Sequence, residues 1–335
     1  KAAEALSGEP KAGRLLVNLT LNDYFVREVP SEAGRLYQLH PLLREFLRNR
    51  AAQSLPEAVS GASLQRAALL LRDTGQTEDA VALLVEAGHW SEVAPIALEE
   101  ADAILAQGRS ETLAGWLDVL PREMIDADPR LLRICAAARA HASPRAARQL
   151  YERAYEGFRR MDDTAGMVQC CCGIIDAVIL EFDDVTPLDV WIGALGTLLE
   201  RDVPGAPAPA DPVAVTTLIR ALLFRDAGNP RLTGWLGRAA TAASTTTVRQ
   251  PAARSCRQAL ALVSAMTMLV QGDLAAADAT LEELRAGATD RTSNEVLALA
   301  LADGLRHLIG GDAAAALRVA RTGLALAGSE GLHAY

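Results

Sequence analysis

Hydrophobic residues recur along most of the chain at the three- and four-residue spacing that gives a helix one apolar face. A glycine turn separates helices of this kind, and it recurs at Gly75, Gly108, Gly272 and Gly311. The two stripes on either side of the first turn are Leu64, Ala67, Ala68, Leu71 and Ala80, Leu83, Leu84, Ala87. Two antiparallel helices around one glycine turn make a repeat unit. The pattern therefore predicts a stack of helical hairpins with units of about forty residues.

Residues that cap helices and are followed by proline predict further helix starts, because proline fits the first helical position. These dipeptides are Asp128-Pro129, Ser143-Pro144, Thr186-Pro187 and Asp211-Pro212. One predicted helix alternates small and aromatic residues on a single face, at Ala147, Leu150, Tyr151, Ala154, Tyr155 and Phe158. This arrangement resembles the packing of tetratricopeptide repeats. The expected shape is a right-handed superhelix.

The pattern before residue 55 is different. Strand-like runs at 24–29 and 36–39 flank a Pro/Gly turn at 30–35, which predicts a β-hairpin, and a helix over 14–23 precedes it. Pro41 then opens a helix in which Leu43, Phe46 and Leu47 predict one buried stripe. A hairpin followed by an amphipathic helix is typical of the wing side of a winged-helix domain.

The composition agrees with a nearly all-α fold. Hydrophobic residues make up 50% of the 335 residues and aromatics only 4%, with Ala and Leu prominent, which favours closely packed helices. We predict a winged-helix remnant with a small hairpin over 1–55 and helical-repeat blocks over 56–202 and 213–335. The proline-rich segment 203–212 is predicted to connect the two blocks.

The charge balance argues against DNA binding by this segment, because the net charge is −9. Only Lys1 and Lys11 are lysines among the 33 basic residues, and the arginines are spread along the chain, which we interpret as codon bias rather than a patch. The longest charge-free apolar run, 259–270, is too short to span a bilayer. The absence of a signal segment and of disulfide-type cysteine spacing predicts an excised piece of a cytoplasmic protein.

Two stretches carry a resemblance to a known family. A hairpin ends at His40, which opens an H-P-L-x-x-x-F-L helix, and residues 116–121 with 128–132 resemble a W-L-D-x-L-P…P-x-L stretch. Both are similar to the MalT-like regulators, which belong to the STAND class of signalling ATPases and often carry a LuxR-type DNA-binding domain. The resemblance implies an upstream ATPase domain that binds ATP or ADP, and a separate output domain. No phosphate-binding G-x-x-x-x-G-K-[ST] motif occurs in this sequence.

His40 is the candidate nucleotide-sensing residue. In STAND ATPases of the plant-resistance and apoptosome type, the winged helix carries a hydrophobic-His-Asp-Leu motif whose histidine donates to the β-phosphate of ADP. Leu39-His40-Pro41-Leu42 is similar, although Pro41 replaces the acidic residue. The resemblance implies that the His40 imidazole contacts nucleotide. The alternative is that His40 only satisfies backbone groups at the strand-to-helix corner.

Other residues with chemical potential favour structural interpretations. Cys170, Cys171 and Cys172 are consecutive on a predicted helix and point apart, so we interpret them as core cysteines rather than metal ligands. We interpret Glu99-Glu100 and Asp183-Asp184 as solvated charges. We assign no chemistry to the isolated histidines His89, His141, His307 and His333. Four further residues could line a ligand-binding face of the stack, but we favour ordinary packing and surface charge for them: Trp191, Arg220, Phe224 and Arg225.

The predicted function is that of a sensor and autoinhibitory segment of a MalT-like transcriptional regulator. It would bind a small-molecule inducer or a protein partner, and would control the nucleotide state and self-association of the whole protein. DNA would be contacted only through an output domain outside this segment. The alternative is a tetratricopeptide adaptor that binds a protein partner without a transcriptional role. No catalytic constellation occurs, so we expect this segment not to be an enzyme.

Overall fold

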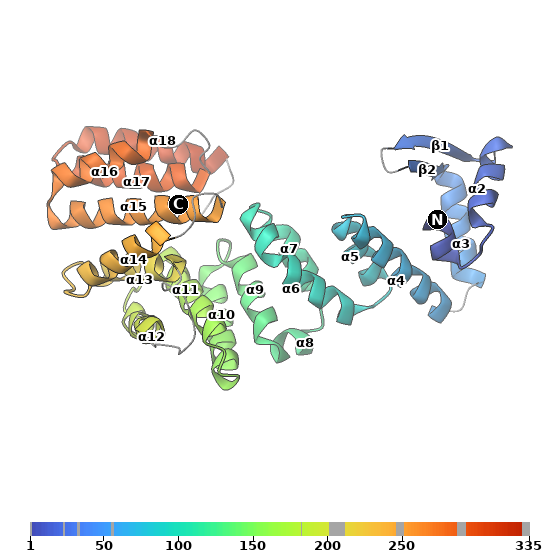
Figure 1. Cartoon of the computed structure of the whole chain (residues 1–335), viewed down its shortest axis with the longest axis horizontal. Helices are drawn as coiled ribbons and strands as arrows, with labels where there is room; N and C mark the ends of the chain where they lie inside the picture. Colours follow the sequence, from blue (N-terminus) through green and yellow to red (C-terminus); the bar gives the residue numbers. More distant parts are fainter. Residues whose placement is uncertain are drawn as a thin grey trace. The chain divides into compact units, whose positions relative to one another are not determined.

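The computed structural model describes the chain except residues 1, 23, 32–33, 55–56, 182, 201–211, 246–250, 287–292 and 330–335. The chain divides into two compact units, Lys1–Arg122 and Glu123–Tyr335. Helices dominate both units, and the described strands form one small antiparallel hairpin (Figure 1). The prediction of an all-α fold with a small β-hairpin is confirmed.

The first unit contains the β-hairpin with its neighbouring helices, followed by two helical hairpins. The helix predicted over 14–23 is α2, and the helix predicted after the hairpin begins at Pro41 as expected. The elements of this unit are α1 (Ala2–Ser7), α2 (Ala12–Leu21), β1 (Val26–Ser31), β2 (Gly34–Leu39), α3 (Pro41–Ser54), α4 (Glu57–Asp73), α5 (Thr77–Glu86), α6 (Trp90–Ala106) and α7 (Ser110–Asp118).

The strands of the hairpin extend further toward the turn than predicted. Pro30 pairs with Arg35 and Ser31 with Gly34, so most of the predicted 30–35 turn belongs to the ladder. The His40 N–H donates to the Phe25 carbonyl at 2.7 Å. Because hydrogen-bonded and non-hydrogen-bonded pairs alternate, Pro30 falls on a non-hydrogen-bonded pair. Its missing N–H therefore costs the ladder nothing, which is why proline did not end the strand.

The buried stripe predicted on α3 is wrong. The Phe46 side chain is 62% exposed and Leu47 is 44% exposed, while Leu43 is only half-buried. The spacing correctly identifies an apolar face, but burial also requires an element that covers it. No element among the described residues covers this face of α3.

The glycine turns share one local structure. Gly75, Gly108, Gly272 and Gly311 all have a positive φ between 72° and 84°. At each turn the next residue donates its N–H to a carbonyl five residues back, as Gln76 does to Leu71 at 2.8 Å. This is the Schellman arrangement, in which glycine has no Cβ to clash in the left-handed conformation.

Two further turns of the same kind were not recognised in the sequence. Gly88 ends α5 with the same bonds and a φ of 70°. Asp162 takes the glycine position after α10 with a φ of 54°, and the Asp163 N–H donates to the Phe158 carbonyl at 3.0 Å. An aspartate follows the left-handed residue in three of these turns and accepts a backbone N–H of the next helix, at Asp163, Asp273 and Asp312. One residue thus ends a helix and the next starts another, so the connections are short.

The second unit is helical throughout its described residues. Its helices follow one another as antiparallel neighbours, with α9 against α10, α10 against α11 and α17 against α18 (Figure 1). They are α8 (Arg122–Ala127), α9 (Pro129–Arg139), α10 (Pro144–Arg160), α11 (Thr164–Glu181), α12 (Leu188–Glu200), α13 (Pro212–Asp226), α14 (Leu232–Thr245), α15 (Pro251–Gln271), α16 (Leu274–Ala286), α17 (Ser293–Ile309) and α18 (Ala313–Ser329).

The capping dipeptides predicted the helix starts well. Helices α9, α10 and α13 begin at Pro129, Pro144 and Pro212, and α12 begins one residue after Pro187. Asp128 accepts the Arg130 N–H at 2.8 Å, as a capping residue should. The predicted connection 203–212 lies outside the described residues except for Pro212, and the predicted domain boundaries stay predictions.

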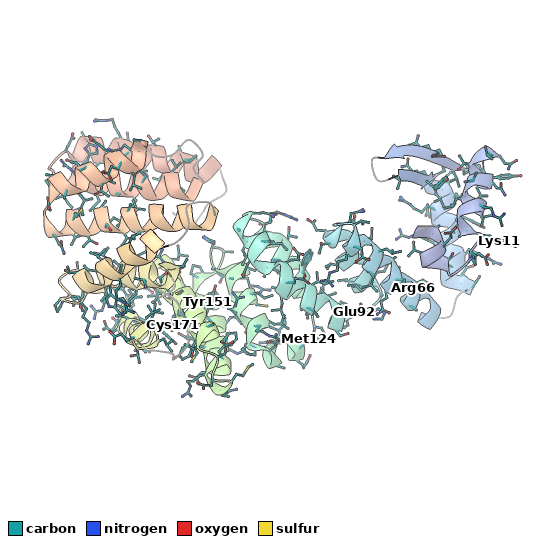
Figure 2. All side chains as sticks on the ribbon, viewed as in Figure 1. Lys11, Arg66, Glu92, Met124, Tyr151 and Cys171 are labelled. Carbon is teal, nitrogen blue, oxygen red and sulfur yellow. The ribbon has the colours of Figure 1, made fainter. Side chains whose placement is uncertain are left out.

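The core of the second unit is formed by helices α9 to α15, and ring-on-glycine contacts bring α9, α10 and α11 together. The Phe158 ring covers Gly166, and the Tyr151 ring covers Gly173, where an added Cβ would lie 2.3 Å from ring carbons. Pro129 covers Gly157 in the same way. Ala147, Tyr151, Ala154 and Phe158 are buried along one face of α10, and Leu150 and Tyr155 are half-buried, which confirms the predicted small-and-aromatic stripe. Tyr151 is labelled in Figure 2.

Arginines form ion pairs between helices, which the compositional interpretation missed. In the first unit Arg72 binds Glu99 of α6, and Arg109 binds Glu78 of α5. In the second unit most of these pairs join neighbouring helices of the stack: Arg148–Glu181, Arg153–Asp126, Arg220–Asp176, Arg225–Asp189, Arg285–Asp303 and Arg306–Asp278. Several of the described arginines are therefore interhelical partners.

Helix α11 is, by length and composition alone, apolar enough to cross a membrane. It is longer than the apolar run 259–270 found in the sequence analysis. In the structure it is a core helix, with Met167, Ile174, Ile175 and Val178 buried among its neighbours. Burial inside the helical stack accounts for its apolar character.

Candidate functional site

His40 lies at the corner where strand β2 ends and helix α3 begins. Its N–H is held by the Phe25 carbonyl, so the hairpin fixes the backbone of the corner. Its Nδ1 accepts the Leu42 N–H at 3.3 Å. Leu42 is the second residue of α3, so His40 caps this helix with its imidazole, and Pro41 occupies the first helical position.

The capping bond determines which imidazole nitrogen can donate. Nδ1 acts as an acceptor, so the proton of the neutral ring lies on Nε2. The backbone role that the alternative interpretation gave to His40 is therefore present. That role uses only Nδ1 and leaves the Nε2–H of an exposed side chain for another acceptor. The two interpretations of His40 are compatible, and nucleotide contact stays a prediction.

Phe25 shapes the same corner. Its φ is 57°, which is uncommon for a large side chain, and its ring meets the His40 ring edge-on at a centroid distance of 5.8 Å. A left-handed residue at the base of a hairpin was not recognisable from the strand pattern.

Arg27 and Gln38 were also missed by sequence reasoning. They are directly opposite each other on β1 and β2. The Arg27 Nε and Nη2 donate to Gln38 Oε1 at 3.0 and 2.7 Å. An open hollow of about 420 Å³ is lined by these two side chains together with Phe25, Val26, Leu39, His40 and Pro41. The predicted turn at 30–35 already implies this register, because it places residue 29 opposite residue 36 and therefore Arg27 opposite Gln38. The hydrogen bonds between the two side chains do not follow from the register alone.

Comparison with known proteins bears on this same part of the chain. Residues 1–59 match the family model of the MalT winged helix domain. The match supports a MalT-like origin for this part of the chain, which we call the MalT winged-helix segment. It includes the hairpin, His40 and α3. No curated protein matches the chain.

The cysteines lie outside the MalT winged-helix segment and are core residues, as interpreted from the sequence. Cys170 and Cys171 are buried in α11, and Cys172 is half-buried. Cys171 is labelled in Figure 2. Burial raises the pKa of Cys170 and of Cys171 to about 12. The thiols therefore stay protonated at neutral pH and are poor nucleophiles. Among the described residues, no group of three metal-ligating side chains comes together.

The paired carboxylates have separate structural partners. Glu99 binds Arg72, and Asp183 binds Arg145 at 3.0 Å. Asp184 accepts the N–H of Thr186 at 2.8 Å, and its pKa is lowered by the Thr186 side-chain and backbone hydrogen bonds. Glu99, Asp183 and Asp184 thus have separate neighbours rather than a shared site. The exposed positions of these three agree with the interpretation as surface charges, while Glu100 is half-buried.

The residues weighed as a ligand face do not converge on one site. Trp191 on α12 meets Tyr155 of α10 edge-on at 5.1 Å. Arg220 pairs with Asp176 of α11, and Arg225 pairs with Asp189 of α12 at 2.8 Å. Phe224 is partly exposed. These contacts favour the packing interpretation.

The remaining histidines show no shared chemistry. His89 lies 3.6 Å from Glu92, and the His307 carbonyl accepts the Asp312 N–H in the Gly311 turn. His141 lies exposed between α9 and α10, and His333 lies outside the described residues. Of the histidines that the structure describes, only His40 combines a hairpin corner, a helix cap and a hollow.

Proposed function

We propose that this chain is the winged-helix and sensor segment of a MalT-like signalling ATPase that regulates transcription. The match over residues 1–59 supports the family, and the helical hairpins after it supply the extended surface that repeat stacks use for binding. In this proposal an ATPase domain precedes the segment and holds ADP in the resting state. An inducer bound by the helical hairpins loosens the winged helix from ADP and permits exchange and self-association.

The geometry of His40 is the observation that carries the proposal. Its Nδ1 is engaged by the α3 backbone, so Nε2–H is directed by a fixed ring. A donor held in place loses little entropy when a phosphate oxygen arrives. A hydrogen bond to a charged group contributes roughly 1.5–3 kcal/mol, which is enough to bias a two-state switch.

The test separates the two nitrogens of His40 in the complete regulator. His40→Asn keeps a side-chain acceptor that can cap α3 but lacks the distal donor, whereas His40→Gln places an amide N–H near the position of Nε2. We expect His40→Asn to accelerate ADP release by roughly tenfold to a hundredfold. His40→Gln should restore part of the retention, and basal transcription should follow ADP release.

Unchanged ADP release in His40→Asn would remove nucleotide sensing from this residue. The gene on either side of the segment gives a second check. A P-loop upstream and an output domain downstream are expected, and their absence would favour the protein-binding adaptor. A thermal-shift screen of this segment against small metabolites tests the inducer, because a ligand that binds only the folded state stabilises it.

A further inference from the structure

The hollow beside His40 is lined by the Arg27 side chain, whose guanidinium is held in place by hydrogen bonds but is not neutralised by a carboxylate. Arg27 is held by the neutral Gln38 amide through two of its N–H groups. It has no carboxylate partner in the part of the chain that the structure describes. A guanidinium has five N–H donors, so three remain for a ligand. This differs from Arg148 and Arg225, whose guanidinium groups bind carboxylates of other helices.

Three features of the hollow favour an anion. Arg27 contributes a full positive charge, and His40 contributes the Nε2–H left by its capping bond. The hollow also adjoins the first residues of α3, a helix of 14 residues whose N-terminal end is electropositive. A ligand with several phosphate oxygens satisfies donors from more than one direction.

We propose that Arg27 and His40 together bind the diphosphate of a nucleoside diphosphate, with Gln38 as the positioning residue for Arg27. The inference rests on the proposed function in taking His40 as a phosphate contact, and it adds Arg27 as a second, charged one. A planar guanidinium suits phosphate because it offers paired N–H groups in a fixed geometry. Gln38 fixes that plane before the ligand arrives.

The test uses this chain with inorganic pyrophosphate as the probe. The side chains of arginine and histidine are labelled with nitrogen-15, and the Arg27 Nε–H and His40 Nε2 signals are followed by nuclear magnetic resonance. We expect both signals to move along one shared saturation curve. ADP should reproduce the shifts and adenosine should not, while inorganic phosphate should bind more weakly than pyrophosphate.

Three variants assign the roles. Arg27→Met should weaken pyrophosphate binding by roughly tenfold or more, since it removes a charge-assisted contact. Gln38→Leu keeps the size of the side chain but removes the acceptor, so binding should weaken by about three- to fivefold while the Arg27 Nε signal shifts and broadens. Arg14→Met is the matched control, because it removes an exposed cation on α2 outside the hollow and should leave binding unchanged.

The outcomes distinguish this inference from the proposed function. Movement of the His40 signal alone would overturn the role of Arg27 and leave the proposed function standing. Movement of neither signal would overturn the shared site in this chain, whereas the proposed function is decided separately by ADP release from the His40→Asn variant of the complete regulator. Movement of the Arg27 signal alone, or equal losses in Arg14→Met, would show non-specific attraction and overturn the shared site. Stronger binding of a DNA duplex than of pyrophosphate would replace the diphosphate with a nucleic-acid backbone.

Discussion

The helices before residue 55 and the stack from α9 to α13 both have apolar faces, but these faces are exposed in the first region and buried in the second. In the stack the apolar faces of α9, α10, α11 and α13 are buried against one another. Before residue 55, Val26 is the one buried hydrophobic residue among those described. Large apolar side chains there are exposed instead: Leu15, Leu21, Tyr24, Phe25, Leu36, Leu42, Phe46 and Leu47. The stack supplies its own partners for burial, whereas the MalT winged-helix segment presents an apolar surface.

The two regions also differ in the partners of their arginines. Arginines of the stack bind carboxylates of neighbouring helices, and Glu181 receives both Arg145 and Arg148. At the hairpin, Arg27 is positioned by a neutral amide. Paired charges hold helices in register, while a fixed unneutralised charge is suited to a ligand. The stack therefore pairs these charges internally, whereas Arg27 has no carboxylate partner among the described residues.

The largest expected effect contrasts two phenylalanines. Phe158 is 2% exposed in the stack, and Phe46 is 62% exposed on α3. Phe158→Ala should lower the free energy of unfolding by about 3–5 kcal/mol, because it removes buried area and leaves a cavity. Phe46→Ala should change it by less than about 0.5 kcal/mol. Urea unfolding followed by far-ultraviolet circular dichroism measures both, and similar losses at the two positions would contradict the comparison.

A smaller effect tests the close packing of the stack with two helical glycines. Gly173→Ala places a methyl group against the Tyr151 ring and should destabilise the stack by about 1–3 kcal/mol. Gly193→Ala on α12 is the matched control, because nothing lies within 4 Å of its added Cβ. It should stabilise α12 by up to about 1 kcal/mol. Thermal melting of both variants checks the sign, and a loss in Gly193→Ala would refute the packing argument.

The smallest effect depends on pH and concerns the Asp128 cap. Burial raises the pKa of Asp128, but hydrogen bonds from Arg130 outweigh burial and the pKa lies below 3.8. A carboxyl with a depressed pKa stabilises the fold above its unfolded value, and this contribution is lost as pH falls through the folded value.

Asp128→Ala should therefore cost about 1 kcal/mol at pH 7, and the difference from the wild type should shrink as pH falls below about 4. Asp128→Asn keeps a neutral cap and should lose less at pH 7. Denaturant midpoints measured across this range test the idea. If the difference in the free energy of unfolding between the wild type and Asp128→Ala grew as the pH fell, the ionised Asp128 would not be what stabilises the fold.

Part of the candidate site was readable in the sequence. The position of His40 between a hairpin and a proline-initiated helix follows from strand alternation and from Pro41. The choice of Nδ1 as the capping atom does not follow, because it depends on how the ring turns toward the Leu42 N–H. Arg27 and Gln38 are opposite each other in the register that the predicted turn at 30–35 implies. Their hydrogen bonds were missed because these depend on how the two side chains turn toward each other.

Local rules in the sequence determined the helices, the glycine and proline boundaries and the small-and-aromatic stripe of α10. These depend on residues within a turn or two of each other, so spacing alone predicts them. Only the tertiary structure decided that the stripe of α10 is buried and that of α3 is exposed. Periodicity specifies which face of a helix is apolar. Burial and ion pairing each need two elements in contact. The spacing of residues within one helix does not predict which other element packs against it.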